Sequence, residues 1–264
     1  TLVDSVMLYG QYRGVSYGRA QGYETYRYFT TATPGTANAA KSYEKRAEKV
    51  TFSVPGGLQQ SNAITLSLSA EEGMNIYYTT DGTEPTASSA IYSGPINIDT
   101  NTVVKAVAWR DDVIQSLTNG ASYIFNASHS VRLVCVSGKS SELTGSSGTL
   151  NTGAKNDGYD VFVEVYEADG TPLLAQNCQL ELSGHASRLQ FEQKAFMLKA
   201  KQVYGENRFN AALFEKRDYT EYKSFTMRAS GQDNQQTHMR DSILTSLAED
   251  TDVMYQETEV SVVF

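Results

Sequence analysis

The sequence predicts a mainly β protein with an α+β region at its C-terminal end. Three observations predict this class. Short runs rich in β-branched and aromatic residues recur through residues 49–126, separated by turn residues at the spacing of a β-sandwich. Tyrosine is abundant, with 17 residues against one tryptophan, which fits β-rich extracellular modules. Helical periodicity stands out near the C-terminal end, where Met239, Ile243, Leu244 and Leu247 recur at helical spacing.

Composition and charge argue against several classes of function. A chain of 264 residues is long enough for one large core or two to three small ones. The net charge of -8 and the pI near 5.0 argue against binding to nucleic acids or anionic membranes, because both attract basic surfaces. Apolar runs in the sequence fall well short of the roughly 18 residues that a membrane span needs, so no membrane span is expected.

The sequence contains two cysteines, Cys135 and Cys178. Neither stands in a CxxC pair or in a Cys/His cluster, so no zinc site is expected. The two thiols could pair in an oxidising compartment, but two free, buried thiols are the favoured interpretation.

Residues 1–38 form a first unit that ends at the Thr33-Pro34-Gly35 turn. The string SYGR…G…FTTATPGTAN resembles the last strands of a bacterial lamin-tail domain, an immunoglobulin-like β-sandwich of which this would be the C-terminal part. A generic β-hairpin followed by a linker is the alternative. Residues 39–48 (AAKSYEKRAE) are charged and have no apolar stripe, which predicts a linker.

The second unit, residues 49–126, is predicted to be a β-sandwich. The Asp81-Gly82 pair supplies a positive-φ turn after a tyrosine-rich strand, and Pro85 and Pro95 limit slippage of the neighbouring strands. Strands are expected at residues 50–54, 64–68, 75–80, 103–109 and 121–125.

The string NIYYTTDGTEPTASSAIYSGPINIDTNTVVKAVAWRDD is very similar to the chitobiase/β-hexosaminidase C-terminal-type module. This module is a fibronectin-III-like sandwich common in secreted multidomain bacterial proteins, so the resemblance implies an extracellular or cell-surface location. In such a module Asp81 serves the turn, while Tyr77 and Trp109 serve the core. Binding of a cell-wall or other polysaccharide through Tyr77, Tyr78 or Tyr92 is the alternative.

The third unit, residues 129–264, is predicted to begin as an antiparallel sheet. Residues 137–160 are rich in Gly, Ser and Asn and are expected to form a long loop. Asp233 or Thr237 is the expected N-cap of the C-terminal helix. Strands are expected at residues 131–136, 161–166, 178–182 and 260–264.

A turn of small residues at 183–187 (SGHAS) is the candidate for a phosphate cradle. Arg188 follows the turn directly, and a second strand is expected to carry Lys194 and Lys199. Exposed backbone amides in such a turn, with fixed cations behind them, bind phosphate in many proteins.

Strict alternation on that second strand would put Lys194 on the same face as Phe196 and Leu198. A lysine among buried apolar residues must extend its ammonium to water or find an anionic partner. A phosphate partner is therefore favoured, and an ordinary surface lysine is the alternative.

Three blocks follow one another in an order that resembles the CotH kinases, the spore-coat-protein-H family of atypical secreted bacterial protein kinases. They are the turn-and-strand block, the RASGQD block at 228–233, and the Arg240-Asp241 pair that opens the helix. The resemblance extends from about residue 129 to residue 264. It implies an incomplete, atypical protein-kinase-like lobe that takes part in transferring the γ-phosphate of ATP, with Mg²⁺, to Ser or Thr hydroxyls of exported proteins.

The same resemblance assigns roles to individual residues. Lys194 would contact the nucleotide phosphates, and Gly184 and Ser187 would offer backbone contacts to them. Arg188 would bind phosphate as a planar fork, with a surface salt bridge as the equal alternative. Asp241 would pair with the strand lysine, with a plain surface ion pair as the alternative.

Within the RASGQD block, Arg228, Ser230, Gly231 and Asp233 would brace the nucleotide cleft or contact the ligand directly. His185 departs from the family pattern and would narrow the cleft.

Ala195, where the family prefers Ser, is a further departure. These departures support a rival function, a non-catalytic cell-surface scaffold, adhesion or carbohydrate-associated binding protein. The family's catalytic and metal-binding acids would follow residue 264. We therefore expect no catalytic or metal-binding residue and no phosphotransfer from these 264 residues.

Overall fold

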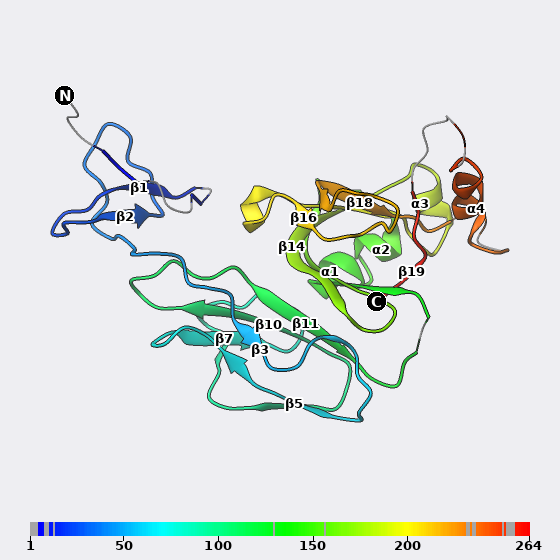
Figure 1. Cartoon of the computed structure of the whole chain (residues 1–264), viewed down its shortest axis with the longest axis horizontal. Coiled ribbons are helices and arrows are strands. Elements are labelled where there is room, and N and C mark those ends of the chain that lie inside the picture. Colours follow the sequence, from blue (N-terminus) through cyan, green and yellow to red (C-terminus); the bar gives the residue numbers. More distant parts are fainter. Residues whose placement is uncertain are drawn as a thin grey trace.

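The structure is a computed structural model that describes residues 5–7, 11–12, 14–128, 130–155, 157–230, 233, 236–249, 251 and 257–264. It is mainly β, as expected, with several sheets and short helices. Figure 1 shows an N-terminal hairpin at one end, a β-sandwich module next to it, and a larger sheet that carries the helices. In this described part of the chain, no helix has the length and the apolarity that crossing a bilayer requires.

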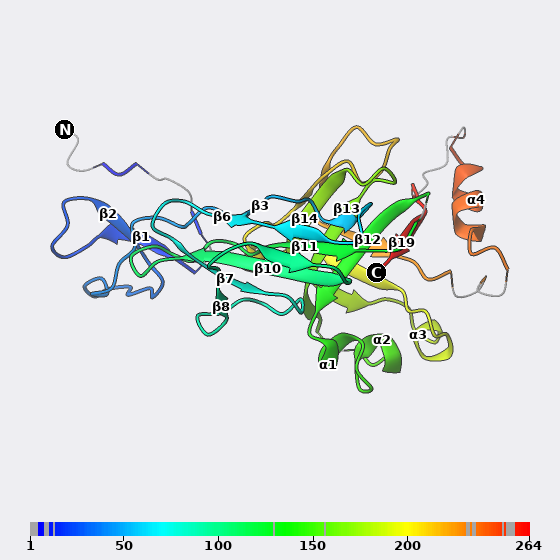
Figure 2. The same ribbon diagram turned by 90° about the horizontal axis from the view of Figure 1, so that it is seen from below.

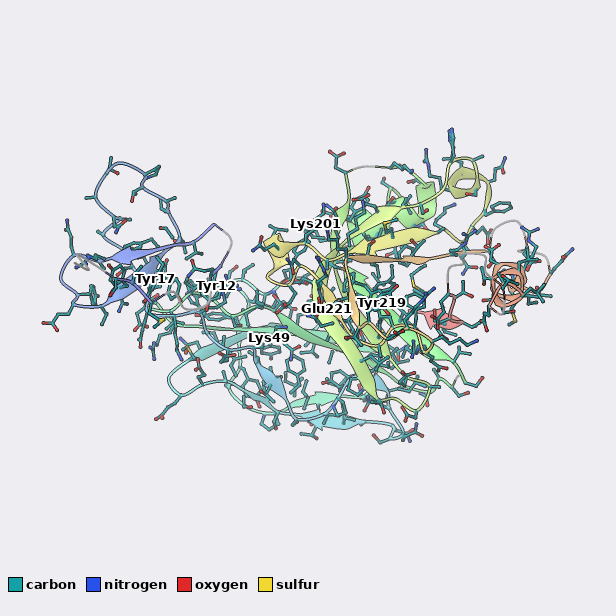
Figure 3. The ribbon with its side chains drawn as sticks, turned by 45° about the horizontal axis from the view of Figure 1, so that its top comes forward. Tyr12, Tyr17, Lys49, Lys201, Tyr219 and Glu221 are labelled. Atoms are coloured by element: carbon teal, nitrogen blue, oxygen red, sulfur yellow. The ribbon has the colours of Figure 1, made fainter. Side chains whose placement is uncertain are left out.

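The N-terminal hairpin consists of β1 (Ser16–Arg19) and β2 (Tyr26–Phe29). Tyr17 and Tyr28 are partners in the antiparallel register, and their ring centroids lie 4.7 Å apart. Tyr12 adds a third ring, 5.3 Å from that of Tyr28. Figure 3 shows Tyr12 and Tyr17 close together at this end of the molecule. Aromatic packing therefore supplies much of the hairpin's core.

Residues 39–48, predicted to be a linker, are hydrogen-bonded to the parts on both sides. Tyr43 exchanges two backbone hydrogen bonds with Tyr28, each 2.8 Å long. Ala47 donates its N–H to the carbonyl of Ile114 at 2.9 Å, next to a parallel bridge. The segment therefore fastens the hairpin to the edge of the module.

The module contains a five-stranded sheet in the order β4-β11-β10-β7-β8 and two further strand pairs, β3-β6 and β5-β9. Its core is closed by side chains from several of these strands, including Leu66, Leu68, Val104 and Tyr123, all at most 5% exposed. All five predicted strands are present, with residues 64–68 divided between two strands. The strands are β3 (Thr51–Phe52), β4 (Gly57–Leu58), β5 (Ile64–Leu66), β6 (Leu68–Ser69), β7 (Asn75–Thr79), β8 (Ala90–Ile91), β9 (Ile96–Ile98), β10 (Thr102–Trp109) and β11 (Asn119–Ile124).

The third unit is organised around a six-stranded sheet in the order β18-β15-β14-β13-β12-β19, in which β19 pairs in parallel with β12. A small hairpin, β16-β17, packs its side chains into the same core. The strands are β12 (Arg132–Gly138), β13 (Tyr159–Tyr166), β14 (Pro172–Leu182), β15 (Phe196–Lys199), β16 (Phe209–Asn210), β17 (Glu221–Tyr222), β18 (Ser224–Met227) and β19 (Ser261–Val263). The helices are α1 (Ser140–Leu143), α2 (Thr149–Thr152), α3 (Ser187–Gln190), the 3₁₀ turn η1 (Gln202–Tyr204) and α4 (Arg240–Ser246).

Both faces of this sheet are covered near β13. Alternate residues of a strand point to opposite sides, so two sets of β13 side chains are buried in different places. Val161, Val163 and Val165 face the core shared with the helices and with β16-β17. The residues between them, Phe162 and Glu164, face the module instead and are at most 1% exposed. A strand buried on both sides explains the nearly continuous apolar run VFVEVY.

The two cysteines lie on opposite faces of this sheet. Cys135 is the register partner of Glu164, and Cys178 is the register partner of Val161. Glu164 and Val161 are an odd number of residues apart, so they and their partners point in opposite directions. Both thiols are free and buried.

Two local expectations for the third unit are wrong. Lys194 does not lie in a strand, because residues 187–190 form α3 and β15 begins only at Phe196. The predicted loop at 137–160 contains two helical turns, α1 and α2. The C-terminal helix is present as α4, at the end of the molecule far from the hairpin (Figure 1).

Candidate functional site

The predicted phosphate cradle borders a cavity of about 260 Å³ in the third unit. One wall is the small-residue turn between β14 and α3, and the other is the segment that leads from β18 to α4. These two segments are far apart in the sequence, and the sheet brings them together because β14, β15 and β18 are neighbours. The cavity is lined by Ser183, Gly184, Ser187, Phe191, Gln193, Ala195, Thr226, Arg228, Ala229, Ser230, Asp233, Arg240 and Asp241.

The shape of the turn depends on Gly184. Its φ is +87°, a backbone conformation that residues with a Cβ rarely adopt. A Cβ there would lie 2.5 Å from Ser187 Oγ, so the space is also taken. Ser183 still donates its N–H to the Ala195 carbonyl at 2.8 Å, which continues the sheet ladder up to the turn. The turn is therefore held at a defined position above the cavity.

The opposite wall is braced by Asp233, which is 6% exposed. Its carboxylate accepts the N–H of Arg240 at 3.1 Å and the hydroxyl of Thr237 at 2.8 Å. The hydrogen bond from Thr237, followed by that from Arg240, lowers the pKa of Asp233 below its usual value. Met239 is the N-cap residue of α4, and the two predicted capping side chains, Asp233 and Thr237, support the same helix start from outside it.

Arg228 and Asp241 form an ion pair of 2.6 Å between the two ends of this wall. Asp241 therefore pairs with an arginine of the RASGQD block, whereas the resemblance implied a pair with the strand lysine. Ser230 also contributes, because its hydroxyl donates to the carbonyl of His238 at 2.7 Å. Gly231, the fourth candidate of that block, lies outside the described residues.

Lys194 stands beside the cavity but does not line it. Its two neighbours, Gln193 and Ala195, both line the cavity, and the Lys194 ammonium donates to the carbonyl of Phe191. The side chain is half-buried, and its described contact is to the backbone of Phe191, not to the turn.

For Arg188 a contact to phosphate or a surface salt bridge was expected, and the structure shows a contact to the backbone of another helix end. Its guanidinium donates to the carbonyl of Gly153, the C-cap of α2, and so ties α3 to α2. Gly153 has φ +70°, and a Cβ there would overlap the carbonyl of Arg188, so the two segments touch without spare room. Arg188 is absent from the residues that line the cavity.

His185, expected to narrow the cleft, is exposed in the turn and does not line the cavity.

Taken together, the lining residues form a small hollow with two arginines, two carboxylates, several hydroxyls and a glycine turn. Such a set can hold an oxyanion but supplies no nucleophile with an adjacent base. Among the described residues, no group of three or more His, Cys, Asp or Glu is placed to hold a metal ion.

The aromatic residues of the module are explained by packing. Tyr77 and Trp109 were expected in the core, but they are half-buried and lie outside the module's core cluster, on neighbouring strands with ring centroids 5.9 Å apart. Tyr78 and Tyr92 meet edge to face at 6.3 Å and pack against the module core. Asp81 serves the turn as expected, because it accepts the N–H of Thr83 at 3.0 Å. Sugar binding through these rings stays a prediction.

The sequence reasoning missed two buried charges, Lys105 and Glu164, each 1% exposed. They lie where the module meets the six-stranded sheet. The sequence does contain a pattern that could have indicated them. Each is the only charged residue in an apolar stretch, Lys105 in TVVKAVAW and Glu164 in VFVEVY. A lone charge in a doubly buried strand points to a paired group at an internal boundary.

Comparison with known families agrees with the architecture of the module. Residues 54–118 match the Chitobiase/beta-hexosaminidase C-terminal domain, so the resemblance proposed for this part of the chain is confirmed. The match covers well under half of the chain. A search among curated proteins found no significant match, and a search among solved structures found none either.

Proposed function

We propose that the third unit binds the phosphate groups of a nucleotide, as part of a CotH-type protein kinase that transfers phosphate from ATP to Ser or Thr residues of exported proteins. One observation carries the proposal. The glycine turn at Gly184 and the arginines Arg228 and Arg240 come from distant parts of the sequence and line the same cavity. Backbone amides of a glycine turn and arginine forks together are a recurrent phosphate-binding set.

The charge balance of the cavity indicates how an anion would bind. Asp233 is committed to the start of α4, while Asp241 is the partner of Arg228. A phosphate carries more negative charge than one carboxylate, so it competes for Arg228 and displaces Asp241. Binding is thus an exchange of partners at Arg228, and Arg240 adds a second positive charge at the same cavity.

The size of the cavity limits the part of the nucleotide that it holds. At about 260 Å³ it is smaller than the roughly 300–1,000 Å³ of typical small-molecule sites. A phosphate group fits, whereas the sugar and base of ATP would lie outside it. The described residues offer no set of acids that fits Mg²⁺, so we assign no step to the metal.

Thermal unfolding of the full chain with millimolar pyrophosphate or ATP tests the proposal. Ligand binding to the folded state raises the midpoint by mass action. We expect this rise in the wild-type protein and its loss in Arg228→Ala. Arg208→Ala is the matched control, because Arg208 is half-buried, does not line the cavity, and its described side-chain bond is to the adjacent carbonyl of Asn207. An Arg228→Ala protein that keeps the full rise would contradict the proposal.

A second candidate is a non-catalytic scaffold or adhesion protein of the cell surface. It is favoured by the mutual neutralisation of Arg228 and Asp241 and by the tight contact between the module and the six-stranded sheet. The same experiment separates the two candidates. Absence of any midpoint rise with either ligand in the wild-type protein favours the scaffold.

A further inference from the structure

The module and the six-stranded sheet meet along β11, which lies against β13 and β14 (Figure 2). A hydrophobic cluster joins the two parts here. It combines Ile124 from the module with Leu133, Cys135 and Tyr166 from the sheet, all at most 5% exposed. Apolar surface buried in this way is stabilising only while the two parts stay together.

A buried carboxylate crosses the same boundary. Glu164 of β13 accepts the N–H of Ser122 in β11 at 2.9 Å, and the Ser122 hydroxyl donates to its other oxygen. Tyr166 donates its hydroxyl to Glu164 from the sheet side. Two of these three donors therefore belong to the module. A carboxylate that is 1% exposed depends on such donors, because burial without them is very costly.

Lys105 makes the reciprocal contact from the module. Its ammonium lies 5.3 Å from the centre of the Phe162 ring, which belongs to the sheet. It also pairs with Glu84 at 3.1 Å, and Glu84 accepts the hydroxyl of Thr118 at 2.7 Å. Each part thus buries one charge against the other part.

Two module glycines show how closely the surfaces fit. A Cβ at Gly120 would lie 2.9 Å from the ring of Phe162, and a Cβ at Gly56 would overlap the hydroxyl of Tyr166. Neither glycine has a positive φ, so space alone accounts for the absence of a side chain at these positions. The interface is packed like a protein interior.

We propose that the sheet face formed by Phe162, Glu164 and Tyr166 is a permanent docking surface for the module of the same chain, so that the two parts fold and unfold as one cooperative unit. The module is then an integral part of the third unit and not an independent spacer. Separation would expose the apolar cluster and leave Glu164 without its module donors.

The chain contains separate reporters for the two parts. The single tryptophan, Trp109, lies in the module, and both cysteines, Cys135 and Cys178, lie in the sheet. Urea unfolding of the full chain is followed by tryptophan fluorescence and, in parallel, by pulse labelling of the thiols with a disulfide reagent. We expect the two midpoints to coincide in the wild-type protein.

Variants test the coupling in both directions. Glu164→Ala changes the sheet and is expected to lower the Trp109 midpoint as much as the thiol midpoint. Gly120→Ala changes the module and is expected to lower the thiol midpoint as much as the Trp109 midpoint. Gly94→Ala is the matched control, because Gly94 is in the module, has no positive φ and has open space around its Cβ position.

Two results would overturn the proposal: separate midpoints in the wild-type protein, or a variant that shifts only the reporter of its own part. Glu164→Gln replaces Glu164→Ala as the sheet variant if the alanine variant does not fold, because the amide keeps an acceptor for Ser122. Its effect is measured by the same Trp109 and thiol midpoints.

Discussion

Arg228 and Asp241 are held 2.6 Å apart in one wall of the cavity, and the glycine turn forms the opposite wall. Both side chains are partly exposed, at 62% and 34%, so the pair is accessible to a competing anion. An exposed ion pair contributes little to stability. For the proposed phosphate binding the pair matters more, because Asp241 occupies the arginine that the proposal assigns to the phosphate.

Asp241→Asn is therefore expected to raise the affinity for pyrophosphate by up to about fivefold, the value of one exposed ion pair. The measurement is a calorimetric titration of the full chain at fixed ionic strength. Asp111→Asn, an exposed aspartate of the module, makes the same change in net charge and should leave the affinity unchanged. An unchanged or weaker affinity in Asp241→Asn would show that Asp241 does not compete with the ligand.

Glu164 predicts a pH dependence of stability. Burial raises its pKa above the usual value of 4.5, against the opposing effect of the hydrogen bonds from Ser122 and Tyr166. Lys105 favours the charged form as well, while Tyr123 and Cys135 also face this carboxylate.

Because the folded state holds the proton more tightly than the unfolded state, this stabilisation is full below pH 4.5 and is lost as the pH rises through the folded pKa. The loss amounts to about 1.4 kcal/mol for each unit by which the pKa is raised. Urea midpoints of the wild-type protein and Glu164→Gln between about pH 4 and pH 8 measure it, and the wild type should lose stability relative to the variant. A difference that stays constant over this range would contradict the prediction. Glu181→Gln, on the same sheet face but 29% exposed, is the control.

Cys135 and Cys178 should not form a disulfide, because they point to opposite faces of one sheet. Burial also raises the pKa of both thiols, which keeps the reactive thiolate scarce. We expect the same unfolding midpoint with and without a reductant, and two reactive thiols only after denaturation. Intact mass measured under non-reducing conditions checks this, and a loss of two hydrogens would disprove it.

Arg188→Ala should lower stability without changing phosphate binding. The change leaves the Gly153 carbonyl without its charged donor, which costs about 1–3 kcal/mol of unfolding free energy. Urea unfolding measures this loss, and the pyrophosphate titration supplies the second readout. A stable variant with weakened pyrophosphate binding would return Arg188 to the phosphate-binding role that the family resemblance implied.

Strand positions were predictable where alternation or continuous apolarity was strong. The runs RLVCVS and VFVEVY became β12 and β13, and the Asp81-Gly82 turn follows β7 as expected. The helix near residue 240 was also predictable from its apolar spacing. That spacing does not translate into burial here, since Ile243 and Leu247 are 50% and 71% exposed.

The short elements could not be predicted from local sequence. A single helical turn such as α3 has little intrinsic stability. In the folded chain Arg188 of α3 is hydrogen-bonded to the Gly153 carbonyl, a contact that the local sequence does not reveal. Residues 39–48 are held through backbone groups, which a side-chain pattern does not reveal.

For the candidate site, Gly184, Ser187 and Asp241, named from the sequence as nucleotide-binding residues, all line one cavity, and their role in binding stays a prediction. It did not indicate Arg240 as a lining residue, and it placed Lys194 on the wrong element. Both outcomes depend on how β15 and β18 lie side by side, which is a tertiary relationship.

The backbone hydrogen bonds of Ile114 with Lys45 and Ala47 have a mechanical consequence, because this bridge and the β4-β11 pair are both parallel. Tension on the two ends of a parallel pair, applied at the start of the first segment and the end of the second, pulls the segments past each other. All the hydrogen bonds then carry load at once, instead of opening one after another. A chain pulled from its N-terminal side would load these bonds in shear.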